Sequence, residues 1–388
     1  MKLIYYTNIF DDQRKNQRQA EKIAMAASRK ILSFYDAMLE HSNIFNKDNL
    51  HIISLGITNI HNSIRIFKPC KVTDRGYTIH FGVFIRLKIV RDIFSIFWAA
   101  TKTIRLVKRN DVVIFYGWSS QYLLSLLICR IIRSKCVLDI EDGPPDKISS
   151  ISTLIQITLF HIYNTLCKDG TVAAANNLLC YSKSKNQLTF YPVSKRYEMK
   201  KNYDSHICQI HFGGSLMKDT GLELLVETIE KLNQQKSISK NYKFLITGYL
   251  SEQNNYRKRL EQIDNVELLG NISFKQLSKE LEKCIIGLSL KLPGTRFGNT
   301  TFPSKVVDII SRAMLLITTD ISDIREIYGN SVLYIEKIHP KILCDIIINI
   351  NNDRVRLKKM AVEAKQISDN ILSPNNTVIK WENFVGKF

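Results

Sequence analysis

Short apolar runs rich in β-branched and aromatic residues alternate with longer helical stretches along this chain of 388 residues. Such continuous apolar runs are typical of strands that are covered on both faces, as in parallel sheets. In the first half we expect strands at 2–6, 50–55, 111–116, 136–140, 177–182 and 188–193. In the second half we expect them at 207–212, 242–248, 265–270, 285–290, 314–319 and 332–336. Two sets of six strands predict an α/β protein with two Rossmann-like domains.

A charged stretch without apolar periodicity, "SKRYEMKKNYDSH" at 194–206, separates the two sets of strands. We therefore expect a first domain at 1–195, a linker at 196–205 and a second domain at 206–372. The remaining segment, 373–388, carries Val378, Trp381, Phe384 and Phe388 at helical spacing. This spacing predicts an amphipathic helix whose apolar stripe packs on a partner surface.

The cysteines and the apolar segments indicate a cytoplasmic protein. Eight cysteines are scattered without a Cys-x-x-Cys pair, and most lie in apolar runs, which favours reduced, buried thiols over a disulfide framework or a zinc site. The first residues do not have the pattern of a signal peptide. The longest apolar candidate, 151–167, contains Gln156, His161 and Asn164, so we expect a buried or interfacial helix there and not a membrane span.

The formal net charge of +19 is concentrated in the first half of the chain. Between residues 65 and 109 there are 11 Lys and Arg against only Asp74 and Asp92. This excess predicts a polyanionic partner, which could be an anionic membrane face, a phosphorylated lipid or a nucleic acid. The alternative is a solvated basic surface that serves solubility alone.

The segment "HFGGSLMKDTGLELL" at 211–225 follows the first expected strand of the second half. Gly213 and Gly214 allow a tight turn at the carboxyl end of that strand, where ligands bind in open α/β sheets. The segment lacks the G-x-G-x-x-G fingerprint, which disfavours a dehydrogenase. A purely structural glycine turn is the alternative interpretation.

A second loop, "SLKLPGTRFGNTTFPSK" at 289–305, runs from a buried strand into a helix that begins near Pro303. On that helix Lys305, Asp308 and Arg312 share one face, which is either a solvated salt-bridge face or part of a binding site. In the second case the loop amides of 298–301, with Arg296 and Lys305, would receive a diphosphate. Asp308 would then accept hydrogen bonds from a ribose diol.

Four segments together resemble the C-terminal half of bacterial GT-B glycosyltransferases of family 4, also called group 1. They are "HFGGSLMKDTGLELLVETIEKL", "YKFLITGYLSE", "NVELLGNISFKQLSKELEKCIIGLSLK" and "FPSKVVDIISRAMLLITTDISDIREI". The resemblance is to members used in capsule, exopolysaccharide and O-antigen assembly. It implies a GT-B fold, with the parallel sheets of two Rossmann-like domains facing across a cleft. It also implies that the helix at 373–388 packs back on the first domain.

The resemblance places functional residues on particular positions of this chain. The family's ribose-binding carboxylate, usually Glu, falls on Asp308, and its other motif Glu is replaced by Thr300. Its phosphate-binding Arg and Lys fall on Ser215 and Thr220, so the positive charge must come from other residues, with Lys218 as one candidate. The donor-binding residues expected from these arguments are Gly213, Gly214, Ser215, Lys218, Arg296, Thr300, Thr301, Lys305 and Asp308.

In the first half, "VLDIEDGPPD" at 137–146 places acidic residues at the end of an expected strand. Related enzymes keep a polar residue here that touches the transferred sugar, which makes Glu141 and Asp142 the candidate catalytic residues. Helix capping or a turn at 143–145 is the alternative. The D-x-E triplet resembles the metal site of a different, single-domain glycosyltransferase fold, but nothing else in the sequence supports that fold, so we expect no metal and no cofactor.

These features together predict a retaining, hexosyltransferase-type enzyme that uses a UDP or GDP sugar. Its acceptor would be a lipid-linked glycan in surface polysaccharide synthesis. The basic first half would hold it on the inner face of the cell membrane. Two alternatives remain open, a catalytically silent GT-B scaffold subunit and a basic nucleic-acid-binding protein.

Overall fold

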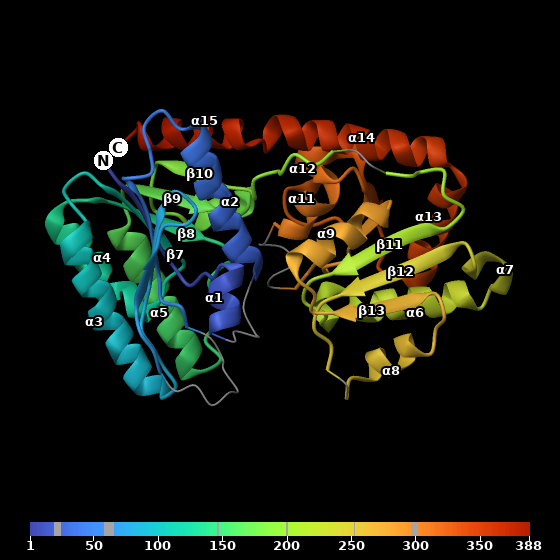
Figure 1. Cartoon of the computed structure of the whole chain (residues 1–388), viewed down its shortest axis with the longest axis horizontal. Coiled ribbons are helices and arrows are strands. Elements are labelled where there is room, and N and C mark those ends of the chain that lie inside the picture. Colours follow the sequence, from blue (N-terminus) through green and yellow to red (C-terminus); the bar gives the residue numbers. More distant parts are fainter. Residues whose placement is uncertain (19–24, 58–65, 146, 199–200, 252, 296–301) are drawn as a thin grey trace. The chain divides into compact units, whose positions relative to one another are not determined.

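The computed structural model describes residues 1–18, 25–57, 66–145, 147–198, 201–251, 253–295 and 302–388. The chain divides into two compact units (Figure 1). Unit 1 contains Met1–Val193 together with Pro374–Phe388, and unit 2 contains Ser194–Ser373. Each unit is an α/β domain with its own sheet and its own apolar core.

Unit 1 is built on an eight-stranded sheet in the order β10-β9-β8-β7-β1-β2-β5-β4. All neighbouring strands are parallel except β4 and β5. The strands are β1 (Leu3–Thr7), β2 (Leu50–Ser54), β4 (Cys70–Val72), β5 (Thr78–Phe81), β7 (Val112–Tyr116), β8 (Lys135–Ile140), β9 (Gly170–Ala173) and β10 (Gln187–Thr189). A separate antiparallel pair consists of β3 (Ile66–Phe67) and β6 (Phe84–Ile85).

The two faces of this sheet bury alternate residues of each strand. Leu3 and Tyr5 of β1 belong to the core that includes α2 and α15, whereas Ile4 and Tyr6 belong to the core on the other face. The helices of unit 1 are α1 (Asp12–Gln17), α2 (Met25–His41), α3 (Lys88–Leu106), α4 (Leu123–Ile132), α5 (Ile151–Leu166) and α15 (Pro374–Val385), with 3₁₀ turns η1 (Ser120–Tyr122) and η2 (Asn176–Tyr181).

The helix α15 packs against α2 although the two are far apart in sequence. The indole of Trp381 is fully buried, with its ring centroid 4.6 Å from that of Phe34 and 5.2 Å from that of Phe190. The Glu382 carboxylate accepts hydrogen bonds from the Ser42 hydroxyl at 2.7 Å and from the Asn43 amide at 2.8 Å. The last helix therefore completes the core of unit 1.

Unit 2 has a six-stranded, fully parallel sheet in the order β13-β12-β11-β14-β15-β16. The strands are β11 (Cys208–Gly213), β12 (Tyr242–Thr247), β13 (Val266–Gly270), β14 (Ile286–Ser289), β15 (Leu315–Thr319) and β16 (Leu333–Ile335). The helices are α6 (Leu222–Asn233), α7 (Lys236–Ser239), α8 (Asn255–Glu261), α9 (Phe274–Lys283), α11 (Ser304–Ser311), α12 (Ile324–Tyr328), α13 (Pro340–Asn352) and α14 (Arg354–Ile371), with 3₁₀ turns η3 (Lys218–Thr220) and η4 (Gly329–Ser331).

Every strand expected in the second half is present, but two predictions for the first half need correction. Residues 177–182 are not a strand, because they form the 3₁₀ turn η2 and bury only Leu178. The expected strand at 188–193 overlaps β10 only at Leu188 and Thr189. The short strands β3, β4, β5, β6 and β9 were missed; each has two to four residues, too few for a clear apolar pattern. The segment 151–167 forms α5, and none of the described helices is long and apolar enough to cross a membrane.

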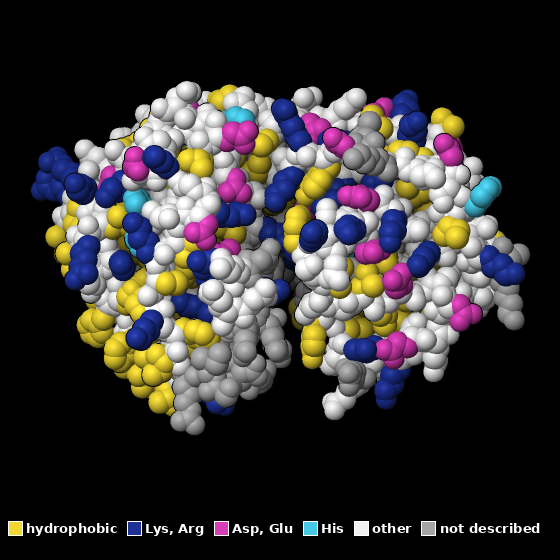
Figure 2. All heavy atoms as spheres, in the orientation of Figure 1, with side chains coloured by type: hydrophobic (Ala, Val, Ile, Leu, Met, Phe, Trp, Pro, Cys, Tyr) yellow, Lys and Arg dark blue, Asp and Glu magenta, His cyan; other side chains and the backbone are white. Residues whose placement is uncertain are grey.

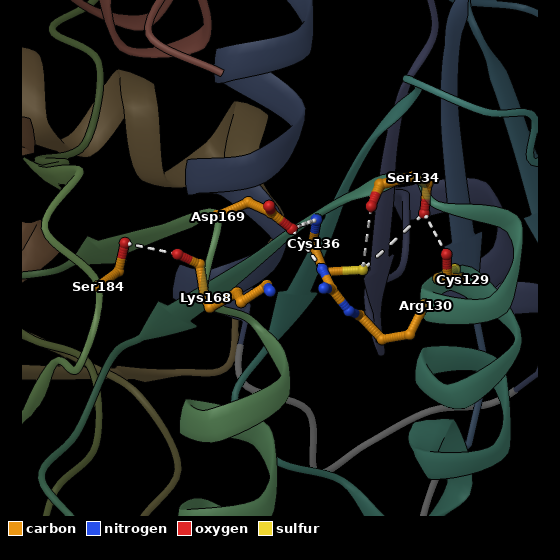
Figure 3. Close-up of polar contacts among 7 residues, drawn as sticks. All are labelled: Cys129, Arg130, Ser134, Cys136, Lys168, Asp169 and Ser184. Carbon is orange, nitrogen blue, oxygen red and sulfur yellow. Dashed lines mark hydrogen bonds and ion pairs between the residues drawn. The ribbon is translucent and has the colours of Figure 1, made fainter.

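All eight cysteines are free thiols, and six of them are buried. Two buried ones lie near a polar cluster at the amino end of β8 (Figure 3). There the Asp169 carboxylate accepts from the Arg130 guanidinium at 2.6 Å and from the Cys136 amide at 2.9 Å, while the Ser134 hydroxyl donates to the Cys129 carbonyl at 3.1 Å. These contacts join α4, β8 and β9, so the cluster is structural.

Candidate functional site

The strand order of unit 2 reverses direction between β11 and β14. In chain order, β12 and β13 follow β11 on one side of it, whereas β14, β15 and β16 follow on its other side. In open parallel sheets, the loops that leave the carboxyl ends of the two strands at such a switch point enclose the ligand crevice. The loops that follow Gly213 and Ser289 are therefore the candidate binding loops of this unit.

Glycines shape the loop edge at the end of β11. Gly214 has a φ of +109°, and a Cβ built on it would meet nothing within 4 Å among the described residues, so a ligand could approach its backbone closely. A Cβ on Gly213 would lie 2.4 Å from Thr247 Oγ1. A Cβ on Gly248, which has a φ of +127°, would lie 2.1 Å from the Gly214 carbonyl oxygen. Glycine is therefore favoured by close contacts at Gly213 and Gly248, and by the positive φ at Gly214 and Gly248.

Lys305, in the first turn of α11, brings a shielded cation to the same edge. The residue is half-buried, but its Nζ atom is inaccessible to solvent and has no hydrogen-bond partner among the described residues. The ammonium lies 4.9 Å from the centre of the Phe212 ring. Burial, with a smaller contribution from the positive charge of Lys291, lowers its pKa to about 8. A buried cation without a carboxylate is costly, which makes this position suited to an anionic ligand.

His211 lies beside this cation and stays neutral. Its Nε2 is 2.9 Å from Thr247 Oγ1, and burial, reinforced by the nearby Lys305, lowers its pKa to about 3. The imidazole can therefore fix the end of β11 but cannot add positive charge near neutral pH.

The first turn of α11 adds backbone donors to the site. Pro303 occupies the N-cap position and provides no side-chain cap for the helix. The amides of the first turn of a helix lack intrahelical partners, and the helix dipole favours negative charge at that end. Asp308 lies one turn after Lys305 and is half-buried.

Of the other expected donor-binding residues, two are exposed and three lie outside the described part of the chain. Ser215 is exposed, and its carbonyl accepts a hydrogen bond from the Thr220 hydroxyl at 2.6 Å. Lys218 is exposed, with its ammonium 3.2 Å from the Glu223 carboxylate. Arg296, Thr300 and Thr301 lie outside the described residues.

The helix α11 does not present a solvated salt-bridge face, which was one interpretation of the spacing of Lys305, Asp308 and Arg312. The helix ends at Ser311, and Arg312 is only 4% exposed. His211, Phe212 and Lys291, which lie near the cation, were not expected from the sequence. A signal existed for Lys291, because it directly follows an expected strand of the switch-point edge.

In unit 1 the candidate carboxylates lie at the carboxyl end of β8. Asp139 is completely buried, and the Tyr5 hydroxyl donates a hydrogen bond to its Oδ2 atom. Burial, reinforced by the negative charge of Glu141, raises the pKa of Asp139 to about 7. Glu141 forms an ion pair with Lys30 of α2, whose ammonium also lies 4.5 Å from the centre of the Phe190 ring.

Glu141 therefore belongs to a charged cluster at the end of β8, and Asp142 follows it directly. Glu141 is partly exposed, with its side chain at 19%, and Asp142 is half-buried. Both carboxylates contribute to raising the pKa of Tyr116, although burial is the larger cause. Lys30 was missed because it lies 111 residues away from Glu141 in sequence. Among the described residues no group of three or more His, Cys, Asp or Glu side chains could hold a metal ion.

Comparison with known proteins identifies the fold of the chain and shows which family part of the second unit matches. Residues 208–353 match the family "Glycosyl transferases group 1". By sequence, no curated protein matches the chain. HepE of Anabaena, solved in complex with UDP, aligns over 100% of both chains with a TM-score of 0.67 and 11% identity.

Two synthases of sugar phosphates have the same architecture. Sucrose-phosphate synthase of Thermosynechococcus elongatus aligns over 100% of this chain and 99% of its own, with a TM-score of 0.65 and 10% identity. The trehalose 6-phosphate synthase of Burkholderia multivorans aligns over 100% and 98%, with a TM-score of 0.65 and 9% identity. The chain therefore has the GT-B fold, and residues 208–353 of it match the group 1 glycosyltransferase family.

Proposed function

We propose that the chain is a glycosyltransferase that moves a sugar from a nucleoside diphosphate donor to a glycan acceptor. The observation that carries this proposal is the shielded ammonium of Lys305 at the switch-point edge of unit 2. A diphosphate placed there would neutralise this buried charge and accept hydrogen bonds from the first-turn amides of α11. The match of this unit to group 1 glycosyltransferases supports the assignment.

The same arrangement suits the chemistry of sugar transfer. When the bond between the sugar and the diphosphate breaks, negative charge develops on the leaving phosphate and positive charge on the sugar. Fixed cations and helix amides stabilise the leaving group without reorganisation, so they lower the barrier. Lys305 and the α11 amides would do this, assisted by Arg296, Lys218 and the backbone of 213–215.

Asp308 would hold the nucleoside by accepting hydrogen bonds from the ribose diol. Thr300 and Thr301, on the loop before α11, would contact the donor as well. The HepE structure with UDP and glucose supports a UDP sugar as the first donor to test. In unit 1, Glu141 and Asp142 would contact the transferred sugar, with the ion pair to Lys30 holding the Glu141 side chain in position. Hexosyl transfer with retention at the anomeric carbon, without a metal, completes the proposal.

Nucleotide titration of the full chain tests this site. We expect saturable binding of UDP or GDP by calorimetry, and a loss of roughly ten- to a hundredfold in affinity for Asp308→Ala and for Lys305→Met, the worth of one charge-assisted contact. Lys243→Met is the matched control, because that lysine is exposed and paired with Glu267 at 2.8 Å.

Three outcomes separate this proposal from its rivals. Unchanged affinity in both Asp308→Ala and Lys305→Met would refute the site. Tight nucleotide binding without any hydrolysis or transfer of UDP sugars would indicate a silent scaffold subunit. Preferential binding of a short oligonucleotide over UDP and GDP would indicate a nucleic-acid-binding protein.

We propose further that the acceptor is lipid-linked, in capsule, exopolysaccharide or O-antigen synthesis, and that unit 1 docks on an anionic membrane. The support is the unusual orientation of α3. This helix buries small or polar residues, Ser95, Ala99, Ala100 and Thr103. It exposes large apolar ones, including Ile89 at 77% and Phe97 at 63%. Exposed apolar patches of this kind mark interaction sites.

Neighbouring elements extend this apolar surface. Large exposed side chains on α4 and at the start of α5 include Ile131, Ile151 and Ile155. Figure 2 shows hydrophobic side chains gathered over the region where α3 and α5 lie in Figure 1. Basic residues of the same helix and the segment before it, among them Arg86 and Lys88, would contribute about 1 kcal/mol each near an anionic surface.

Flotation with lipid vesicles tests the docking surface. Binding to vesicles with anionic lipid should weaken steeply with salt and should fail with neutral vesicles, because salt screens the basic contacts. The double variant Phe94→Ser/Phe97→Ser should bind less at every salt concentration, whereas the exposed control Val355→Ser in unit 2 should bind normally. Equal binding to neutral and anionic vesicles would refute the electrostatic contribution to membrane binding. Normal binding by the double variant would refute the contribution of the apolar side chains of α3.

A further inference from the structure

Unit 2 contains a pocket that lies apart from the Lys305 edge. Its volume is about 210 Å³, and it is lined by Arg196, Tyr197, Glu198, Lys201, Glu282 and Arg312. Arg312 comes just after the carboxyl end of α11, whereas Lys305 is in the first turn of the same helix. The seven residues between them correspond to about 10 Å along the helix axis. The pocket therefore lies at the opposite end of α11 from the cation of the proposed donor site.

Arg312 is the buried cation of this pocket. It is 4% exposed, and its guanidinium lies 3.9 Å from the centre of the Tyr197 ring. One terminal nitrogen, Nη1, donates to the Ser278 hydroxyl at 3.1 Å. The other two nitrogens, Nε and Nη2, are buried and have no hydrogen-bond partner among the described residues.

These two nitrogens form the edge of the guanidinium that binds two-oxygen anions. Elsewhere in unit 2, Arg259 uses the same pair of atoms to hold Glu230, with Nε and Nη2 at 2.7 and 2.5 Å from the two carboxylate oxygens. Carboxylates and phosphates match this planar fork in a bidentate manner. A buried guanidinium edge left without such a partner costs free energy.

The other charged residues of the pocket do not fill this role. The Lys201 ammonium is committed to the carboxyl end of α9, where it donates to the carbonyls of Leu281, Glu282 and Cys284. The Lys201 ammonium therefore adds positive charge to the pocket, while its N–H groups already donate to these three carbonyls. Glu198 and Glu282 are exposed residues, and neither carboxylate accepts from Nε or Nη2 of Arg312.

We propose that this pocket binds a small oxyanion, a phosphate or carboxylate group, on the Nε and Nη2 edge of Arg312. The volume is below the roughly 300 to 1,000 Å³ of pockets for larger ligands, so the site fits a single small anionic group and not a nucleotide.

The bound anion would act on the segment that connects the two units. Four of the lining residues, Arg196, Tyr197, Glu198 and Lys201, follow directly after Val193, the last residue of the first part of unit 1. Glu282 and Arg312 belong to the body of unit 2. An anion held by Arg312, whose guanidinium packs against the Tyr197 ring, would therefore fasten the connecting segment to the body of unit 2.

Inorganic phosphate is the first probe, with sulfate and acetate in parallel at constant ionic strength. We expect saturable binding by calorimetry and slower tryptic cleavage at Arg196 and Lys201 when the anion is bound. Acetate binding without phosphate binding would identify a carboxylate ligand. Because phosphate could also bind at the proposed donor site, the titration is repeated with Lys305→Met, in which binding at Arg312 should persist.

Variants assign the binding to the guanidinium edge. Arg312→Lys keeps the charge and loses the fork, so phosphate affinity should fall at least tenfold. Arg325→Gln is the matched control, since that guanidinium also lies 3.9 Å from a tyrosine ring centre but already pairs with Asp320 and Glu336. If Arg312→Lys fails to fold, Glu282→Gln at the rim should tighten phosphate binding at least twofold. No saturable binding of any of the three anions, or unchanged binding in both Arg312→Lys and Glu282→Gln, would overturn the proposal.

Discussion

Replacing Trp381 by alanine should destabilise unit 1 and leave unit 2 unchanged, although the substitution lies seven residues from the C-terminal end of the sequence. The indole is fully buried and contacts three aromatic rings, those of Phe34, Phe190 and Phe384. Removal of a buried Trp side chain costs about 3 to 5 kcal/mol, which combines lost apolar burial and the cavity that remains. This is a large part of the 5 to 15 kcal/mol typical of a domain.

Hydrogen exchange read out by mass spectrometry measures the two units separately within the full chain. Protection of β1 and β9 should fall in Trp381→Ala, while protection of β11 and β14 should match that of the parent protein. Ile379→Ala is the control on the same helix, because that side chain is 46% exposed and should cost less than about 1 kcal/mol. A uniform loss of protection in both units, or a loss confined to unit 2, would refute the reasoning.

Three further predictions concern other buried groups. Burial is the main cause that lowers the pKa values of His51 and His80 to about 4. The free energy of unfolding should therefore fall as the pH drops from about 6.5 to 4, by up to about 3 kcal/mol for each histidine. Urea unfolding at pH 7 and pH 5 measures this, and equal stability at the two pH values would contradict it. Gly248→Ala should lower the unfolding temperature of unit 2 by several degrees, because its φ of +127° and a backbone oxygen 2.1 Å from the new Cβ leave no room; an unchanged melting curve would argue against the turn geometry. Lys30→Met should lower the free energy of unfolding by about 3 kcal/mol, because it leaves the Glu141 carboxylate without its partner. Glu141→Gln should lower this free energy less in the Lys30→Met background than in the parent protein. Equal effects in the two backgrounds of this double-mutant cycle would show that the ion pair is not formed.

The sequence predicted the second unit better than the first, for a physical reason. All six strands of unit 2 are apolar runs bounded by polar turns, and their order along the chain is regular. In unit 1, β9 has the sequence "GTVA" and β5 has "TIHF", which carry too few apolar residues to stand out. The run "NLLCYS" has the composition of a strand but forms a 3₁₀ turn, because composition alone does not distinguish the two over six residues.

The candidate site was only partly predictable for similar reasons. Lys305 could be named from its position after Pro303, but the shielding of its ammonium depends on Phe212, which is brought near by the fold. Helical periodicity placed Arg312 on a polar face, yet α11 ends at Ser311, and Ala313, the residue after Arg312, has a φ of +54°. The periodicity therefore no longer applies at Arg312, and its side chain enters the interior.

The division of unit 1 into two stretches of sequence has a consequence for synthesis of the chain. Pro374–Phe388 cannot join the core of unit 1 until the whole of unit 2, 180 residues from Ser194 to Ser373, has been made. At a translation rate of roughly 5 to 20 residues per second, the apolar surface around Phe34 and Phe190 remains uncovered by Trp381 for about 10 to 40 s. Unit 2 has a continuous sequence and its own core, so we expect it to complete its folding first. Chaperone contacts during translation should therefore concentrate on α2 and β10 of the unit that is synthesised first and finished last.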